Sequence, residues 1–163
     1  MTLDAAAGPE WLHSHAHVPN PSVPAGDGTL RCFLPEGHSV DWSVDALQRL
    51  PVSEVSGCFI VSTGHGTSGP FTFGGVSLRQ FFAHLMAVDA LWAQVDAISA
   101  DGFGARLLRA EVEEAPLDRP VLLAYRCNGQ PLTRQQGLVR LIVPTEQEDA
   151  LKQVKWLAQL VVR

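Results

Sequence analysis

The sequence lacks long apolar runs, since no segment approaches the roughly 18 consecutive apolar residues that indicate a membrane-spanning helix. It also lacks a basic run, because its 12 Lys and Arg residues are scattered and are outnumbered by 17 acidic residues. The formal net charge of −5 argues against a general nucleic-acid-binding protein, since nothing would neutralise a row of phosphates. Neither a membrane nor a nucleic acid is therefore an expected partner.

Cysteine is also scarce. Cys32, Cys58 and Cys127 form an odd number at wide spacings, which is neither a disulfide framework nor a zinc-binding pattern. Their apolar neighbours predict three small buried side chains. The first residues lack the basic start and apolar core of a secretory signal, so a cytoplasmic location is expected.

The composition favours one folded domain, because 46% of the 163 residues are hydrophobic and only 18% are charged. Residues 1–28 are rich in proline and glycine and are predicted to form an irregular N-terminal arm, with residues 29–163 as the domain. In the arm, His13, His15 and His17 alternate, so an extended segment would present three imidazoles to one side. These could bind zinc or copper, and a weak adventitious site is the alternative.

Strands and short helices are predicted to follow one another irregularly. Ser43 and Ser77 are expected to cap helices, and Asn128-Gly129 is a hairpin signal. The sequence has no regular βαβ rhythm, so the predicted fold class is α+β rather than a doubly wound sheet. Strands are expected at 29–34, 55–61, 95–99, 120–127, 138–143 and 156–162, and helices or helical turns at 43–50, 78–92, 109–115 and 149–155.

The segment STGHGTSGPFTFGGVSL follows the second predicted strand and is expected to be a loop of small residues. Gly64 and Gly66 would let the backbone approach a ligand closely. Their N–H groups, with the hydroxyls of Thr63 and Thr67, could hydrogen-bond a polar heterocycle. His65 could donate a hydrogen bond to such a ligand or act as a general base, and the alternative is a loop histidine without a role.

Several short motifs along residues 29–163 occur together in the order found in one known family. The run from NGQPL through RLIVP to VKW is specific in combination, although each piece alone would be weak. On these motifs the chain resembles the molybdopterin-binding domain of the sulfite oxidase family, which implies that family's single-domain α+β fold and a pterin or molybdopterin cofactor. The motifs are Phe73–Leu78 (FGGVSL), Asp101–Gly104 (DGFG), Leu122–Tyr125 (LLAY), Asn128–Leu132 (NGQPL), Gln136–Pro144 (QGLVRLIVP) and Val154–Trp156 (VKW).

The resemblance implies a pterin pocket with the glycine-rich segment as one wall. Arg140 and Lys155 could meet the phosphate of the cofactor, Arg140 by a bidentate fork and Lys155 as a point charge. Two ordinary surface charges are the alternative. Phe103 and Gly104 belong to the DGFG motif and are expected in the pocket, where the Phe103 ring could stack on the pterin, although core packing is the commoner fate of such rings.

The resemblance is incomplete at the metal. Family enzymes bind molybdenum through a cysteine thiolate, and the matching position here falls near Ser62 or Thr63, whose hydroxyls are poor replacements. Cys58 lies four or five residues earlier and could be the ligand after a shift, with a buried core thiol as the alternative. Phe103 stands where sulfite-oxidising members carry a tyrosine, and Gln136 where they carry a histidine, so sulfite oxidation is not expected.

Three functions remain open. The favoured one is a pterin-binding module that does not coordinate molybdenum. The first alternative is a molybdopterin-dependent oxidoreductase with Cys58 as the metal ligand and His65 near the substrate. The second alternative is a protein-interaction module on the same fold. The direction of the Cys58 sulfur and of the Arg140 and Lys155 side chains should discriminate among them.

Overall fold

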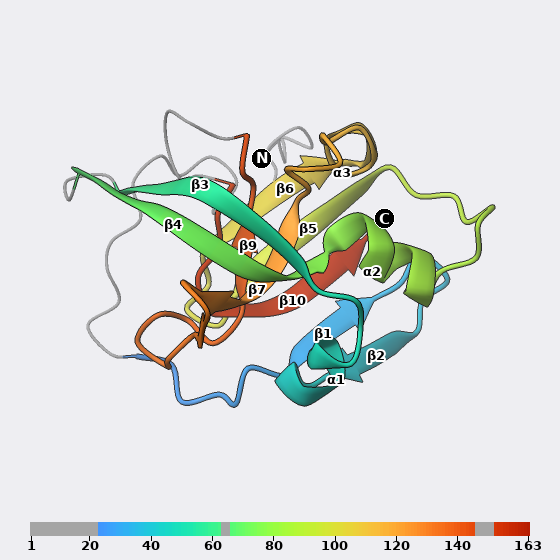
Figure 1. Cartoon of the computed structure of the whole chain (residues 1–163). Coiled ribbons are helices and arrows are strands. Elements are labelled where there is room, and N and C mark those ends of the chain that lie inside the picture. The colour runs from blue at the N-terminus through green and yellow to red at the C-terminus, as the bar shows by residue number, and fades with distance from the viewer. Residues whose placement is uncertain (1–22, 63–65, 146–151) are drawn as a thin grey trace, which may run out of the picture.

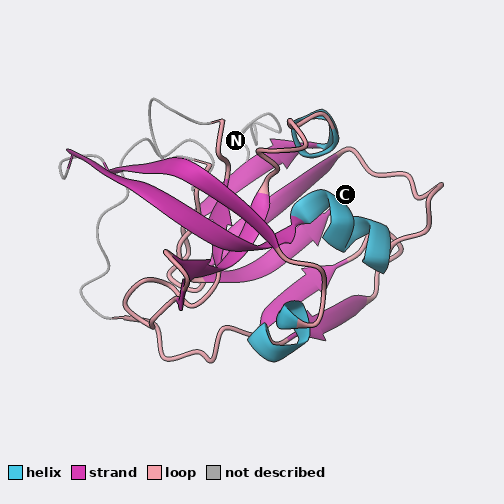
Figure 2. Cartoon of the chain, viewed as in Figure 1, coloured by secondary structure: helices cyan, strands magenta, loops and turns pink. Residues whose placement is uncertain are grey.

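The computed structural model describes residues 23–62, 66–145 and 152–163, which form two β-sheets and three short helices (Figures 1 and 2). The elements are β1 (Leu30–Phe33), β2 (Ser39–Trp42), α1 (Val44–Gln48), β3 (Ser53–Ser62), β4 (Gly66–Ser77), α2 (Leu78–Leu85), β5 (Gln94–Ser99), β6 (Gly104–Leu108), α3 (Arg109–Glu113), β7 (Leu122–Cys127), β8 (Gln130–Pro131), β9 (Arg140–Ile142) and β10 (Leu157–Val162).

The first sheet has the strand order β2-β1-β10-β5-β6, and the second runs β3-β4-β7-β8 with β9 also paired to β7. Only β1 and β10 pair in parallel, and the other pairs are antiparallel. This mixture confirms the predicted α+β class. Among the described residues, no helix has the length and apolar character needed to cross a membrane.

Most of the predicted elements are present, but the strands β4 and β8 were not predicted, and neither were β2 and β6. β2 and β6 are short strands, each of which returns from a turn to pair with the strand before it, β2 with β1 and β6 with β5. SVDW alternates between polar and apolar residues but is only four residues long, and GARLL does not alternate, so tertiary pairing rather than pattern specifies these strands. The predicted helical turn at 149–155 falls partly outside the described residues, and Lys152–Lys155 is not helical.

The main core lies between the two sheets and includes the apolar face of α2. Ser77 caps α2 as predicted, because its hydroxyl accepts a hydrogen bond from the Gln80 backbone N–H at 3.4 Å. The helix ends at Leu85, earlier than the predicted 92, where Met86 adopts an extended conformation. The chain then leaves the helix, and Trp92 returns to pack edge-on against Phe82, with ring centroids 5.2 Å apart.

Strand β7 is buried on both faces, which explains its uninterrupted apolar sequence. Leu123 and Tyr125 point into the main core, while Leu122 and Ala124 point to a second, smaller cluster on the other face of the sheet. We call this cluster the small core. Its buried members are Val55, Cys58, Phe73, Leu122, Ala124 and Ile142.

Arg119 ties the outer edge of β3 to the chain that follows β9. Its guanidinium donates hydrogen bonds to the backbone oxygens of Ser56 at 2.8 Å and Pro144 at 3.1 Å. Gln153 donates a further bond to the Phe59 oxygen at 3.3 Å. These donors satisfy carbonyls that an edge strand would otherwise leave free, and they enclose the small core.

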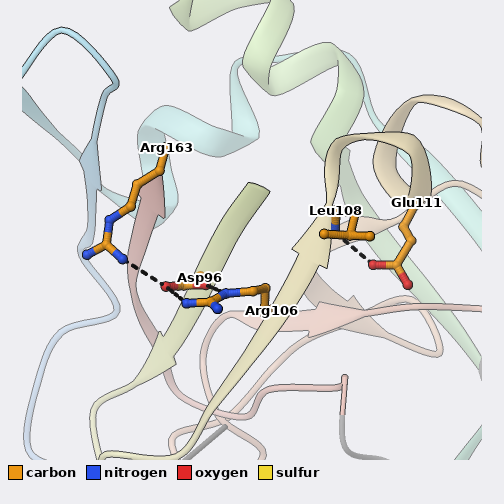
Figure 3. A network of polar contacts seen from close by, with 5 residues as sticks. All are labelled: Asp96, Arg106, Leu108, Glu111 and Arg163. Carbon is orange, nitrogen blue, oxygen red and sulfur yellow. Dashed lines mark hydrogen bonds and ion pairs between the residues drawn. The ribbon is translucent and has the colours of Figure 1, made fainter. Parts of the chain in front are cut away.

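A buried carboxylate joins β5, β6 and the C-terminal residue (Figure 3). The Asp96 side chain is 3% exposed and accepts two hydrogen bonds from Arg106, at 2.7 and 3.0 Å. The Arg163 guanidinium lies 3.5 Å from the second carboxylate oxygen. These hydrogen bonds raise the pKa of Arg106 above its ordinary value.

Replacing Asp96 by asparagine is expected to lower the free energy of unfolding by about 2–3 kcal/mol, because it leaves a partly buried guanidinium without its anion. Asp41→Asn is the matched control. Asp41 forms the same two-bond pair with Arg31 across β1 and β2, but both side chains are about half exposed and solvent screens the pair, so a much smaller loss is expected than for Asp96→Asn. Urea unfolding of both variants measures this, and equal losses would contradict the role of burial.

Candidate functional site

Arg140 and Lys155, which are fifteen residues apart in the sequence, meet over Gly137. A Cβ atom on Gly137 would lie 2.8 Å from Cγ of Lys155 and 3.3 Å from Cγ of Arg140. Gly137 also has φ +113°, so glycine is required for both conformation and space. Val154 brings the two segments together, because it exchanges backbone hydrogen bonds with Leu141 at 2.8 and 3.1 Å.

The Arg140 guanidinium is largely removed from water. Arg140 pairs with Ala124 across β9 and β7, which directs its side chain toward the small-core face of the sheet. Its Nη1 donates to the Gln136 oxygen at 3.3 Å, but its Nε is buried and has no hydrogen-bond partner among the described residues. Burial lowers the pKa of Arg140 to about 10. An unpaired donor on a buried cation is costly unless an anion completes the site.

Lys155 supplies a second cation beside the first. Its ammonium nitrogen lies 4.2 Å from the centroid of the Trp156 ring. Burial, and then the neighbouring Arg140, lower the pKa of Lys155, while Asp101 acts in the opposite direction. Within residues 23–62, 66–145 and 152–163, neither Lys155 nor Arg140 forms an ion pair with an acidic side chain. The chain therefore concentrates positive charge at one point although its net charge is −5. We call Gly137, Arg140 and Lys155 the anion site.

The backbone beside the anion site is strained. Leu138 has φ 58° and Trp156 has φ 50°, a region that bulky side chains rarely adopt. Each residue directly follows a member of the anion site. Such strain costs roughly 1–3 kcal/mol per residue and tends to cluster at ligand-binding sites.

The DGFG turn lies next to the anion site through the backbone, as Ala100 donates a hydrogen bond to the Trp156 oxygen at 2.8 Å. The predicted turn at Asp101-Gly102 is present, with Gly102 at φ 92°. Phe103 is half-buried and its ring packs against the main core. Core packing was the alternative to stacking on the pterin for this ring. Gly104 is buried and opens β6 opposite Ile98.

The glycine-rich segment is not the predicted loop. Thr63, Gly64 and His65 lie outside the described residues, but β4 begins at Gly66. Gly66 and Thr67 are exposed and pair with the end of β3, and this pairing overrides the local preference of glycine against a strand.

The start of β4 also lies far from the anion site. Gly75 pairs with Ala124, the residue opposite Arg140. Thr67 precedes Gly75 by eight residues along β4 (67 to 75), which is roughly 25 Å of strand. The fold therefore does not bring Gly66 and Thr67 to Arg140 and Lys155.

The predicted buried strand at 55–61 is only partly confirmed. Val55 and Cys58 in β3 are buried, but the prediction is wrong beyond them, since Phe59 is 47% exposed.

Cys58 faces the small core. Its side chain is 2% exposed, and its sulfur lies 3.5 Å from the Val55 oxygen, to which it donates. Burial raises the pKa of Cys58, although Arg119 acts in the opposite direction. A molybdenum ligand has to open to the metal, and this buried sulfur, which is directed to a backbone carbonyl, does not fit that requirement.

The other cysteines offer no better metal ligand. Cys32 is fully buried, which raises the pKa of its thiol to about 12. Cys127 is half-buried at the end of β7, and burial raises its pKa while Arg140 acts in the opposite direction. All three thiols are free; the prediction of three buried side chains is confirmed for Cys32 and Cys58 but is wrong for Cys127, which is half-buried. No group of three or more His, Cys, Asp or Glu side chains in the described residues could hold a metal ion, and His13, His15 and His17 lie outside them.

Two residues of the site were missed by sequence reasoning. Gly137 and Trp156 sit within the motifs QGLVRLIVP and VKW, but only the charged residues of those motifs were assigned a role. A glycine three residues before β9 and a tryptophan directly after a lysine are the signals that could have identified them. Their roles depend on contacts between the two motifs, which spacing in one sequence does not reveal.

Comparison with known proteins gives a consistent result. A family model described as the oxidoreductase molybdopterin binding domain matches residues 17–163. No curated protein matches the chain. Among solved structures, the sulfane dehydrogenase SoxCD from Paracoccus pantotrophus is similar with a TM-score of 0.63 and 20% sequence identity, over 82% of this chain and 37% of that one. The chain thus spans well under half the length of that relative, and the likeness confirms the predicted fold.

Proposed function

The chain belongs to the oxidoreductase molybdopterin-binding domain family. We propose that it binds a pterin cofactor at the anion site and that no cysteine thiolate of the protein coordinates a metal there. The observation that carries the proposal is the buried Nε of Arg140, which finds no partner among the residues that the structure describes, beside the ammonium of Lys155. In proteins of this kind the cofactor supplies the redox chemistry, and the chain supplies binding, orientation and electrostatics.

The phosphate of the cofactor is the group that best fits the anion site. Its oxygens can accept hydrogen bonds from Nε of Arg140 and from the Lys155 ammonium at the same time. Both bonds would be charge-assisted and therefore stronger than bonds between neutral groups. A dianion would also offset the repulsion between the two cations, which adds to burial in lowering the pKa of Lys155. The strained backbone at Leu138 and Trp156 supports a preformed site rather than two chance surface charges.

The environment of Cys58 supports the absence of a protein thiolate on the metal. Its sulfur is directed to a backbone carbonyl within the small core, and burial raises the pKa of this thiol. Phe103 lacks the hydroxyl of the matching tyrosine in sulfite-oxidising members, and its ring packs on the core. Both features favour a pterin-binding module over a sulfite-oxidising enzyme. The predicted protein partner stays a prediction.

The test is the cofactor content of the full-length protein purified from cells fed with molybdate. Acid-released pterin is quantified by fluorescence and molybdenum by mass spectrometry, both per mole of protein. We expect close to one pterin with far less molybdenum. Stoichiometric molybdenum would overturn the module, and its loss in Cys58→Ser would then assign the ligand. Absence of pterin would overturn cofactor binding itself.

A further inference from the structure

We infer that Trp156 is a positioning residue that holds the Lys155 ammonium at the anion site, and that Arg134 locks Trp156 in place. The inference rests on the proposed function, because it concerns how the same site keeps its affinity. Trp156 donates no side-chain hydrogen bond toward Arg140, so its effect on an anion would pass through Lys155.

The first step is the contact between the indole ring and the ammonium. A lysine side chain is a long flexible stem, and repulsion from Arg140 would drive its charged end away into water. The Trp156 ring, whose centroid is 4.2 Å from the Lys155 nitrogen, offers an attractive face that opposes this movement. The ring therefore keeps two like charges together before any anion arrives.

The second step is how the ring itself is held. The indole N–H of Trp156 donates to the Arg134 backbone oxygen at 2.6 Å, and the Trp156 oxygen accepts from Ala100 at 2.8 Å. These bonds fix the residue at φ 50°, a conformation that a tryptophan does not favour by itself. Strain of this kind persists only where the surroundings over-determine it.

The third step leads to the segment before β1. The Arg134 guanidinium donates to the Pro24 oxygen at 2.9 Å and also contacts the Gly26 oxygen. A cavity of about 70 Å³ lies between this segment and the turn that carries Trp156. It is lined by Pro24, Gly26–Thr29, Ala100, Gly137, Leu138 and Trp156–Ala158. Contacts thus run from Pro24 through Arg134 and Trp156 to Lys155.

A double-mutant cycle on the full-length protein tests the inference, with inorganic phosphate as the probe and calorimetric titration as the measurement. Trp156→Leu is expected to weaken phosphate binding about five- to tenfold. In a Lys155→Met background the same substitution is expected to change the affinity less than twofold, because the ring has no ammonium left to hold. Trp156→Phe keeps an aromatic face and is expected to retain most of the affinity. Equal losses with and without Lys155 would overturn the inference.

A spectroscopic readout separates positioning from folding. Lys152 and Lys155 are the only lysines in the sequence, so their side-chain methylene signals can be assigned by NMR on lysine-labelled protein. The Lys155 signal is expected to show an upfield ring-current shift that disappears in Trp156→Leu and persists in Trp156→Phe. An unshifted Lys155 signal in the unaltered protein would overturn the contact. Absence of phosphate binding by the unaltered protein, with the ring-current shift intact, would instead refute the anion site.

Discussion

Replacing Arg140 by glutamine is expected to cause the loss of most of the pterin that is bound to the purified protein. The substitution removes a buried donor that has no hydrogen-bond partner in the described part of the chain, together with one of the two charges that would hold a phosphate. Hydrogen bonds to charged groups contribute about 1.5–3 kcal/mol, so the affinity is expected to fall between tenfold and about a hundredfold. The measurement is acid-released pterin per mole of purified protein, beside the unaltered chain.

The matched control for this experiment is Arg79→Gln, which makes the same change of charge at an exposed position on α2. It is expected to leave the pterin content unchanged. Arg140→Lys keeps the charge but loses the planar fork, so an intermediate pterin content is expected. If Arg140→Gln retains as much pterin as Arg79→Gln, the cofactor phosphate does not bind at Arg140.

The stability of the Arg140→Gln variant provides a second readout. Burial lowers the pKa of Arg140 from its ordinary 12.5 to about 10, so the folded state binds the proton less tightly than the unfolded state. The resulting penalty is fully present at neutral pH and is relieved only as the pH rises above about 10. Without ligand, the free energy of unfolding of the variant at pH 7 is therefore expected to stay the same or to rise. A loss above about 1 kcal/mol would indicate that Arg140 mainly supports the fold.

Replacing Gly75 by alanine is expected to prevent stable folding. A Cβ atom at this position would lie 1.9 Å from the Leu123 oxygen and 2.8 Å from Cα of Ala124, and both are parts of the backbone that cannot move aside locally. Strand β7 would have to separate from β4, and β7 is buried on both faces. We expect a loss of at least about 3 kcal/mol, seen as a large drop in the thermal midpoint or as insoluble protein.

The neighbouring glycine is the matched control. A Cβ atom on Gly74 would meet the Arg126 and Glu54 side chains at no closer than 3.5 Å, which is ordinary contact. Gly74→Ala is therefore expected to cost less than about 1 kcal/mol. Similar losses at the two positions would contradict the close approach of β4 and β7. Ala124 lies opposite both Gly75 and Arg140, so a shift of β7 would also displace Arg140. Any fraction of Gly75→Ala that still folds is therefore expected to lose pterin.

Local chemistry in the sequence was sufficient for several elements. The Asn128-Gly129 pair predicts the turn between β7 and β8, and both residues have positive φ, at 51° and 79°. Ser43 predicts the start of α1, and its hydroxyl accepts a hydrogen bond from the Ala46 N–H at 3.1 Å. Signals of this kind depend on a few neighbouring residues, so they do not depend on the tertiary surroundings.

The glycine-rich segment shows where local reasoning fails. The glycines of this segment disfavour a strand, but the pairing that β3 supplies overrides this local preference from Gly66 onward. Local reasoning also fails at Cys58, whose neighbours allow either a metal ligand or a core thiol. Its orientation follows from the register of β3 beside β4 and from Arg119, which the local sequence does not contain.

The sequence by itself determined the fold class, most of the strands and, through its motifs, the family to which the chain belongs. It also singled out Arg140 and Lys155. Only the tertiary structure decided that the two cations share one site over Gly137, that the Arg140 Nε has no partner within the described ranges, and that the Cys58 sulfur faces the small core. The physical reason is that burial and charge–charge distance depend on segments far apart in the chain, and no local pattern encodes them.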